Sequence, residues 1–190
     1  MELADIRYFR SRDKNVISNE KVVGIDPGLV NVGVGVLWYG RSSVHVYRSK
    51  LRGVSRLNEI AAYVQAHCRG SRVACVEGYS YGSGFQDHQL GEAGGALRIA
   101  ILGVGCRLLV LPPTSLKMFV TGKGNTPKEY MQWFVQRRWG VVCKTSHEAD
   151  AYGLARYGAL YLAIEERRVR VEELHPKIQQ IFRKGPTWVT

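Results

Sequence analysis

Residues 21–40 read KVVGIDPGLVNVGVGVLWYG, two apolar runs that enclose one carboxylate, Asp26. β-branched residues recur on both sides of the turn-forming segment 27–31, a pattern that predicts a β-hairpin. A carboxylate beside a buried strand is costly unless a turn, a hydrogen bond or a bound cation offsets its desolvation. Taken alone, Asp26-Pro27-Gly28 is typical of a tight turn. The function of Asp26 therefore depends on which residues the fold brings next to it.

The rest of the chain predicts an α/β fold. A third strand is expected over 43–49, and a helix over 54–68 leads to a short buried strand over 72–78. Because the order strand, helix, strand favours parallel pairing, we expect a mixed five-stranded sheet, three antiparallel strands and then parallel ones, flanked by helices. The last strand is expected at 106–111, and further helices at 90–105, from 114, at 127–138 and at 145–168.

No repeat or linker divides this body, so one domain is expected over residues 21–168. A polar N-terminal extension, residues 1–20, would precede it, and a basic C-terminal tail, residues 169–190, would follow. The four cysteines are far apart and form no C-x-x-C pair, which argues against a disulfide framework and a structural zinc site. No apolar stretch has the length of a signal-peptide core or a membrane span. We expect a protein of the bacterial cytoplasm, or of the host cytoplasm if a phage encodes it, without membrane contact.

The charge balance favours a polyanionic partner. Lysine and arginine number 27 against 16 acidic residues, which gives a net charge of +11. Nucleic acid suits such a chain better than a membrane surface, because no strongly amphipathic lysine-rich helix is evident.

Acidic residues stand where two of the predicted strands end. Asp26 ends the first strand and Glu77 ends a later strand that is expected to lie parallel beside it. In open α/β sheets, ligand sites gather outside the carboxyl ends of the strands. His147 and Asp150 are three residues apart on a predicted helix and share a face, whereas Glu148 points elsewhere. A cluster of Asp26, Glu77, His147 and Asp150 is therefore predicted at one edge of the sheet.

Such a cluster needs cations, because carboxylates a few ångströms apart repel one another. Mg²⁺ prefers carboxylate oxygens and binds phosphate, and two such ions about 4 Å apart clamp the attacking and leaving oxygens of a phosphodiester. We therefore expect two Mg²⁺ ions, with Mn²⁺ as a substitute. Asp26 would bridge both ions, Glu77 and Asp150 would each hold one, and His147 would be a ligand or a proton-transfer group.

Five segments, in order, resemble the RuvC-type Holliday junction resolvases, which have the ribonuclease H-like fold. These segments span about residues 21–165 and read GIDPGLVNVGVGVL, VACVEGYSYGSG, LGEAGGALRIAI, LPPTSLKMFVTGKGNTPKEYM and HEADAYGLARYGAL. Asp26, Glu77 and Asp150 match acids of the family's catalytic set, and His147 takes a position where many members have aspartate and some histidine. The resemblance implies a Mg²⁺- or Mn²⁺-dependent homodimer that nicks opposing strands of a four-way junction in DNA recombination and repair.

The resemblance also implies DNA-binding residues. Lys117, Lys123 and Lys128 match a basic DNA-contacting segment, although each alone is also typical of a solvated face. The family's glutamine and wedge phenylalanine after the strand-end glutamate are replaced here by Gly78-Tyr79-Ser80-Tyr81. An aromatic residue of this loop could stack on an unpaired base or line a dimer interface. The candidates are Tyr79, Tyr81 and Phe85.

Two other functions share these features. A ribonuclease H-like nuclease that cleaves other branched DNA or RNA–DNA hybrids would use the same metal chemistry. A non-catalytic junction-binding protein would keep the fold and the basic surface, but the complete acid set argues against it. An actin-like kinase would need more chain and a second phosphate loop. We therefore expect an endonuclease that resolves Holliday junctions by symmetric, metal-dependent phosphodiester hydrolysis.

Overall fold

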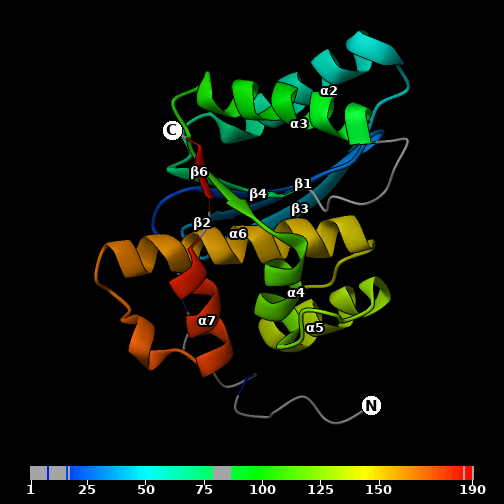
Figure 1. The fold of residues 1–190 in the computed structure, drawn as a ribbon. Helices are drawn as coiled ribbons and strands as arrows, with labels where there is room; N and C mark the ends of the chain where they lie inside the picture. Colours follow the sequence, from blue (N-terminus) through cyan, green and yellow to red (C-terminus); the bar gives the residue numbers. More distant parts are fainter. Residues whose placement is uncertain (1–7, 9–15, 17, 79–86, 186, 190) are drawn as a thin grey trace.

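The computed structural model describes residues 8, 16, 18–78, 87–185 and 187–189. A twisted sheet lies between two layers of helices (Figure 1). β1 (Val22–Pro27), β2 (Asn31–Trp38) and β3 (Arg41–Arg48) form an antiparallel meander. β4 (Val73–Glu77) lies parallel to β1, and β5 (Arg107–Leu111) lies parallel to β4. The five predicted strands and their directions are thereby confirmed.

A sixth strand, which we did not predict, widens the sheet. β6 (Thr187–Val189) pairs antiparallel with β5, which gives the order β3-β2-β1-β4-β5-β6. The strand has only three residues, too few for an alternating pattern to show in the sequence.

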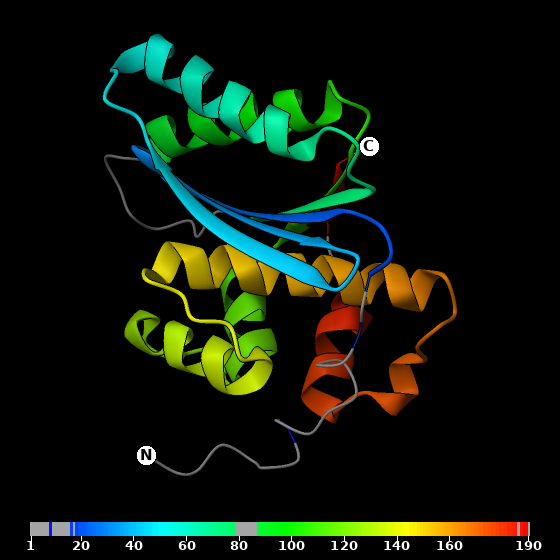
Figure 2. The same cartoon turned by 180° about the vertical axis from the view of Figure 1, so that it is seen from behind.

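Helices cover both faces of the sheet. α2 (Gly53–Cys68) and α3 (Asp87–Leu102) lie on one face, as Figure 2 shows from behind. The long helix α6 (Ser146–Glu165) crosses the other face, and α4 (Pro113–Thr121), α5 (Met131–Trp139) and α7 (Pro176–Lys184) pack around it. Short 3₁₀ turns, Lys128–Tyr130 and Val171–Glu173, precede α5 and α7. Within the described residues, no helix is both long and apolar enough to cross a lipid bilayer.

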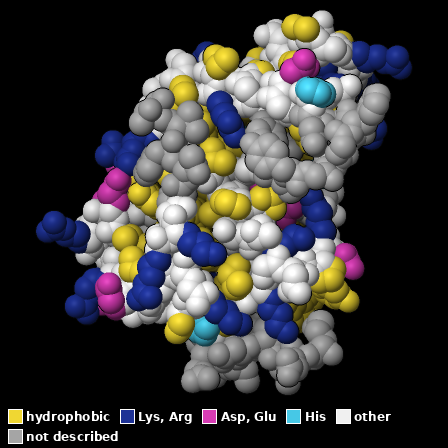
Figure 3. All heavy atoms as spheres, viewed as in Figure 1, with side chains coloured by type: hydrophobic (Ala, Val, Ile, Leu, Met, Phe, Trp, Pro, Cys, Tyr) yellow, Lys and Arg dark blue, Asp and Glu magenta, His cyan; other side chains and the backbone are white. Residues whose placement is uncertain are grey.

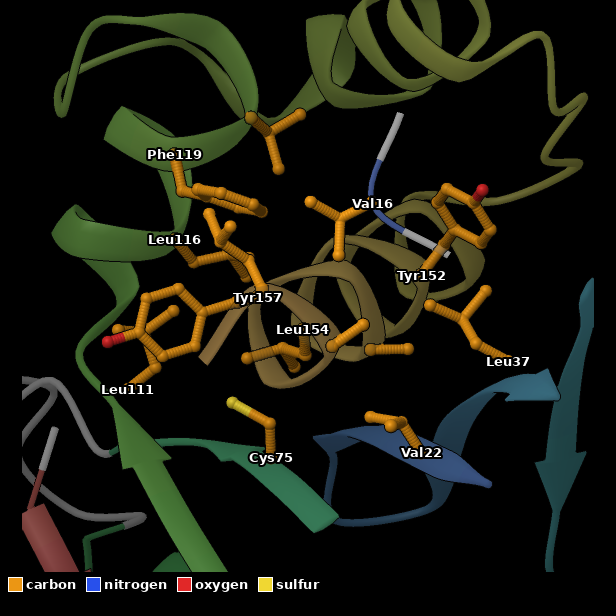
Figure 4. Close-up of a cluster of buried hydrophobic side chains, with 14 of the residues drawn as sticks. Val16, Val22, Leu37, Cys75, Leu111, Leu116, Phe119, Tyr152, Leu154 and Tyr157 are labelled. Atoms are coloured by element: carbon orange, nitrogen blue, oxygen red, sulfur yellow. The ribbon is translucent and has the colours of Figure 1, made fainter. Parts of the chain in front are cut away.

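Strand alternation divides the core into two clusters and decides where the acids point. Val23 and Ile25 of β1 are buried among side chains of α2 and α3, whereas Val22 is buried on the side of α6. Figure 4 shows Val22 and Cys75 directed from the strands toward Leu154 and Tyr157 of α6. Asp26 is four residues after Val22, and Glu77 is two residues after Cys75. Because side chains alternate along a strand, both acids point to the same face of the sheet as these residues, the face covered by α6.

The C-terminal segment differs from the predicted tail. Residues 169–185 pack on the body, because Ile178 and Ile181 of α7 are buried in the core cluster that contains α6. The ring of Phe182 stacks on that of Tyr157 with the centroids 4.9 Å apart. The apolar residues of this segment stand among many basic ones in the sequence. For this reason its composition suggests an appendage rather than a packed helix.

The N-terminal extension also contributes to the core. Tyr8 is buried, and its hydroxyl donates to the Met118 carbonyl at 2.7 Å and accepts from Nη1 of Arg138 at 2.9 Å. The guanidinium of Arg138, itself buried, lies 4.5 Å from the centre of the Tyr8 ring. Tyr8 therefore contacts the C-terminal parts of both α4 and α5.

We expect Tyr8→Ala to lower the free energy of unfolding by about 2–4 kcal/mol, because it removes a buried ring and leaves Arg138 with fewer partners. Tyr8→Phe keeps the ring and should cost about 1–2 kcal/mol. Urea unfolding of the two variants beside the wild type measures both effects. Equal stability of all three proteins would show that the extension does not hold α4 and α5 in solution.

Candidate active site

Three carboxylates meet at the carboxyl edge of the sheet. Asp26 comes from the end of β1, Glu77 from the end of β4 and Asp150 from the second turn of α6. One oxygen of each lies within 4.8 Å of the others. The convergence of these acids, predicted from strand ends and helix spacing, is thus present in the structure.

Glycines in the hairpin allow α6 to approach the acids. A Cβ atom on Gly33 would lie 2.4 Å from the His147 carbonyl oxygen, and one on Gly24 would lie 2.0 Å from the Ala151 carbonyl oxygen. The helix backbone therefore rests directly on the strands, which no residue with a side chain permits at these positions. Gly33 pairs with Asp26 across the hairpin, so the contact lies beside the acid itself.

The start of α6 is fixed by its cap. The Thr145 hydroxyl accepts from the Glu148 amide at 3.2 Å, and the Glu148 carboxylate accepts from the backbone amide of Lys144. Glu148 is thereby occupied outside the acidic cluster, as predicted. His147 and Asp150, in contrast, face the edge of the sheet where the acids meet.

His147 lies against Asp26. Its Nδ1 is 2.5 Å from Oδ2 of Asp26, and the imidazole is partly exposed whereas the carboxyl is buried. This hydrogen bond raises the pKa of His147, although burial acts in the opposite direction. The imidazole is therefore held against the strand-end acid, with its ring partly open to solvent.

Lys128 lies beside Asp150. Its Nζ is 3.2 Å from Oδ2 of Asp150, with the lysine half-exposed and the carboxyl buried. Burial opposes the charge of Lys128, but the carboxyls of Asp26 and Asp150 outweigh it and raise the pKa of the lysine. Burial and then the neighbouring Asp26 raise the pKa of Asp150 to about 6. The resemblance implies DNA contact for Lys128, and the structure places its ammonium beside Asp150 of the acid cluster.

Glu77 is the most perturbed carboxyl of the cluster. Burial, followed by repulsion from Asp26 and Asp150, raises the pKa of Glu77 to about 9. A carboxyl at the end of a strand and open to water would not be perturbed in this way. Carboxylates this close together oppose one another's ionisation. A divalent cation bound through their oxygens would offset this repulsion and favour the charged forms.

The comparisons with known proteins agree with this geometry. No protein-family profile matches the chain. Crossover junction endodeoxyribonuclease RuvC of Rhodospirillum rubrum is 28% identical over 163 residues, which cover 76% of this chain and 95% of that protein. RuvC of Carboxydothermus hydrogenoformans is 28% identical over 156 residues, covering 74% and 96% of the two chains.

Solved structures show the same relation. The Thermus thermophilus RuvC structure aligns with a TM-score of 0.62 at 25% identity and covers 76% of this chain and 96% of that one. The T. thermophilus RuvC in complex with a Holliday junction substrate aligns with a TM-score of 0.63 at 23% identity, over the same shares. In sequence and in fold, the chain is similar to the RuvC-type Holliday junction resolvases. The ribonuclease H-like fold predicted from the resemblance is confirmed.

The other two predicted lysines lie on α4 and in the loop that follows it. Lys117 is partly buried on α4, and Lys123 is exposed in the loop after that helix. Tyr79, Tyr81 and Phe85 fall outside the described residues, so their assignment to base stacking remains a prediction.

Sequence reasoning missed the residues that hold the loop around Lys123. The Thr121 hydroxyl bonds to the Lys123 carbonyl at 2.9 Å and lies 2.7 Å from the Thr126 hydroxyl. Both threonines are buried. The signal was the pair of threonines that flank the segment GKGN, since threonine side chains bond readily to nearby backbone in turns.

Proposed function

We propose that the chain is a structure-selective DNA endonuclease that resolves Holliday junctions by symmetric hydrolysis of phosphodiester bonds. The observation that carries this proposal is the meeting of Asp26, Glu77 and Asp150 within 4.8 Å at the edge of a RuvC-type sheet. The net charge of +11 supports a polyanionic substrate. The similarity to proteins named crossover junction endodeoxyribonuclease supports the four-way junction as that substrate.

The carboxylates would hold two Mg²⁺ ions, with Mn²⁺ as a substitute. Asp26, Glu77 and Asp150 would hold these ions through their carboxylate oxygens. Oxygen donors alone suit these hard cations better than zinc or copper. When bound, such ions supply an activated water and neutralise the charge that develops on the phosphodiester.

The chain's own side chains would manage protons and charge. When Nδ1 of His147 donates to Asp26, its Nε2 is left with the lone pair that can accept a proton from water. Lys128 is long and half-exposed, so its ammonium can leave Asp150 and meet a phosphate oxygen of the substrate. His147 is thus proposed as a proton-transfer group rather than a fourth metal ligand.

Symmetric resolution requires two active centres. The acid cluster described above can act on one strand at a time, whereas a junction is resolved by nicks in two opposing strands. We therefore propose that the chain works as a homodimer. The bacterial sources of the similar proteins support a location in bacterial cytoplasm.

Nicking of a labelled synthetic four-way junction tests the function. We expect paired symmetric nicks in Mg²⁺, none in EDTA, and no comparable cleavage of linear duplex, a flap or an RNA–DNA hybrid. Cleavage of flaps or hybrids in preference to junctions would move the assignment to another ribonuclease H-like nuclease. Tight junction binding without any metal-dependent cleavage would favour a non-catalytic junction-binding protein.

A further inference from the structure

A notch lined by polar and apolar side chains lies between α7 and the start of α4. Its volume is about 150 Å³. Two hydroxyl and two ammonium side chains line it together with Met118, Gln180 and Ile181, and the segment at Gly124 forms a third wall. The residues that the argument uses are Thr114, Ser115, Gly124, Lys177 and Lys184. We call this feature the α4–α7 notch.

The notch has a fixed shape, because both of its helices are anchored. Ile178 and Ile181 of α7 are buried, and Ile181 lines the notch beside the partly buried Lys177 and the exposed Lys184. The helix begins at a cap in which Nδ1 of His175 accepts from the Lys177 amide at 3.3 Å. A Cβ atom on Gly124 would lie 3.2 Å from the Thr114 carbonyl, so the loop is packed against α4.

The lysine charges in the notch are not neutralised by acidic side chains. No acidic side chain lines it, and within the described part of the chain neither Lys177 nor Lys184 has an ion pair. Figure 3 shows lysine and arginine side chains gathered on the face that carries α4 and α7. Lys123, one residue before the Gly124 wall, is exposed beside the notch. An anion with several oxygens would satisfy these donors.

The notch opens near the proposed reaction site. Leu111, the last residue of β5, pairs with Glu77, and its carbonyl accepts from the Gly78 amide at 2.8 Å. Thr114 follows Leu111 by only three residues, so α4 begins just beyond the sheet edge where the acids meet, as Figure 1 shows. A DNA strand that lies across this edge would reach the notch by continuing along the protein surface.

We propose that the α4–α7 notch binds a backbone phosphate of the DNA substrate and that α7 thereby extends the DNA-binding surface. This inference rests on the proposed function, because it assigns part of the same substrate. Lysine ammonium groups and the Thr114 and Ser115 hydroxyls donate to phosphate oxygens without reading sequence. The contact would strengthen binding to any DNA arm that leaves the active site in this direction.

The test is the salt dependence of junction binding by Lys177→Gln/Lys184→Gln, measured in EDTA so that no cleavage occurs. Loss of one phosphate contact lowers the slope of log affinity against log salt by about 1 and should weaken binding roughly 10-fold at moderate salt. Lys177→Arg/Lys184→Arg keeps the charge and should retain the wild-type slope. The matched control, Arg69→Gln/Arg167→Gln, removes two exposed charges at the opposite edge of the sheet and should also leave the slope unchanged.

Nicking by the same proteins separates the two proposals. If the wild type nicks junctions and the lysine double variant keeps the wild-type slope, the notch does not hold DNA and only this inference fails. If the wild type neither binds nor nicks junctions, the proposed function fails first. An equal loss of slope in the control would show that overall charge, rather than the notch, sets affinity, and would overturn the inference.

Discussion

Asp26→Asn should abolish nicking of a four-way junction while the protein still binds the junction. The substitution removes the carboxylate that touches His147 and completes the cluster with Glu77 and Asp150, without changing the basic surface. We expect the nicking rate in Mg²⁺ to fall at least about 1,000-fold, which corresponds to about 4 kcal/mol of transition-state stabilisation. Single-turnover cleavage measures the rate, and gel-shift binding in EDTA measures the affinity.

Glu129→Gln is the matched control for the loss of one negative charge near the site. Glu129 follows Lys128 in the chain but is exposed and lies outside the acid cluster. Its nicking rate should stay within about twofold of the wild type, because an exposed charge in water contributes little to a site it does not touch. Lost junction binding in a folded Asp26→Asn protein, or an undiminished nicking rate, would contradict the assignment of Asp26.

The strands and the acid cluster could be predicted because they depend on short patterns. Alternation in the hairpin set the first two strands, and it also directed Asp26 to one face. The three-residue spacing of His147 and Asp150 was enough to put both on one side of α6. Glu77 was found from its position at the end of a strand, a signal that needs only the order of the elements.

Other features depend on contacts between segments far apart in the chain. Lys128 joins Asp150 because the turn before α5 lies over the start of α6, and nothing in the local sequence indicates that meeting. Tyr8 reaches Arg138 across 130 residues. The glycines of β1 and β2 read as strand residues of low propensity, yet their function is to admit the backbone of α6.

Glu77 should make the metal-free protein less stable as the pH rises. Its pKa is raised from the ordinary value of 4.5 to about 9, first by burial and then by Asp26 and Asp150, so the folded state binds a proton that the unfolded state releases. The stability from this proton is complete below pH 4.5 and is lost as the pH rises toward 9. Between pH 4.5 and 7.5 the loss can reach about 4 kcal/mol.

Urea unfolding in EDTA at several pH values, for the wild type and Glu77→Gln, measures this loss. The glutamine keeps the size of the side chain and cannot ionise, so the variant should lose clearly less stability over the same range. Asp150, whose pKa is raised to about 6 from 3.8, adds a smaller loss of the same sign to both proteins. Glu92 is an exposed acid on α3, and the variant Glu92→Gln should follow the wild-type curve.

Added Mg²⁺ should restore the stability of the wild type at high pH but not that of Glu77→Gln, because a cation that binds the charged carboxylate favours the folded state by mass action. Parallel pH curves for the wild type and Glu77→Gln would show that this carboxyl is not held in a perturbed state, and the argument that the cluster needs a cation would lose its main support.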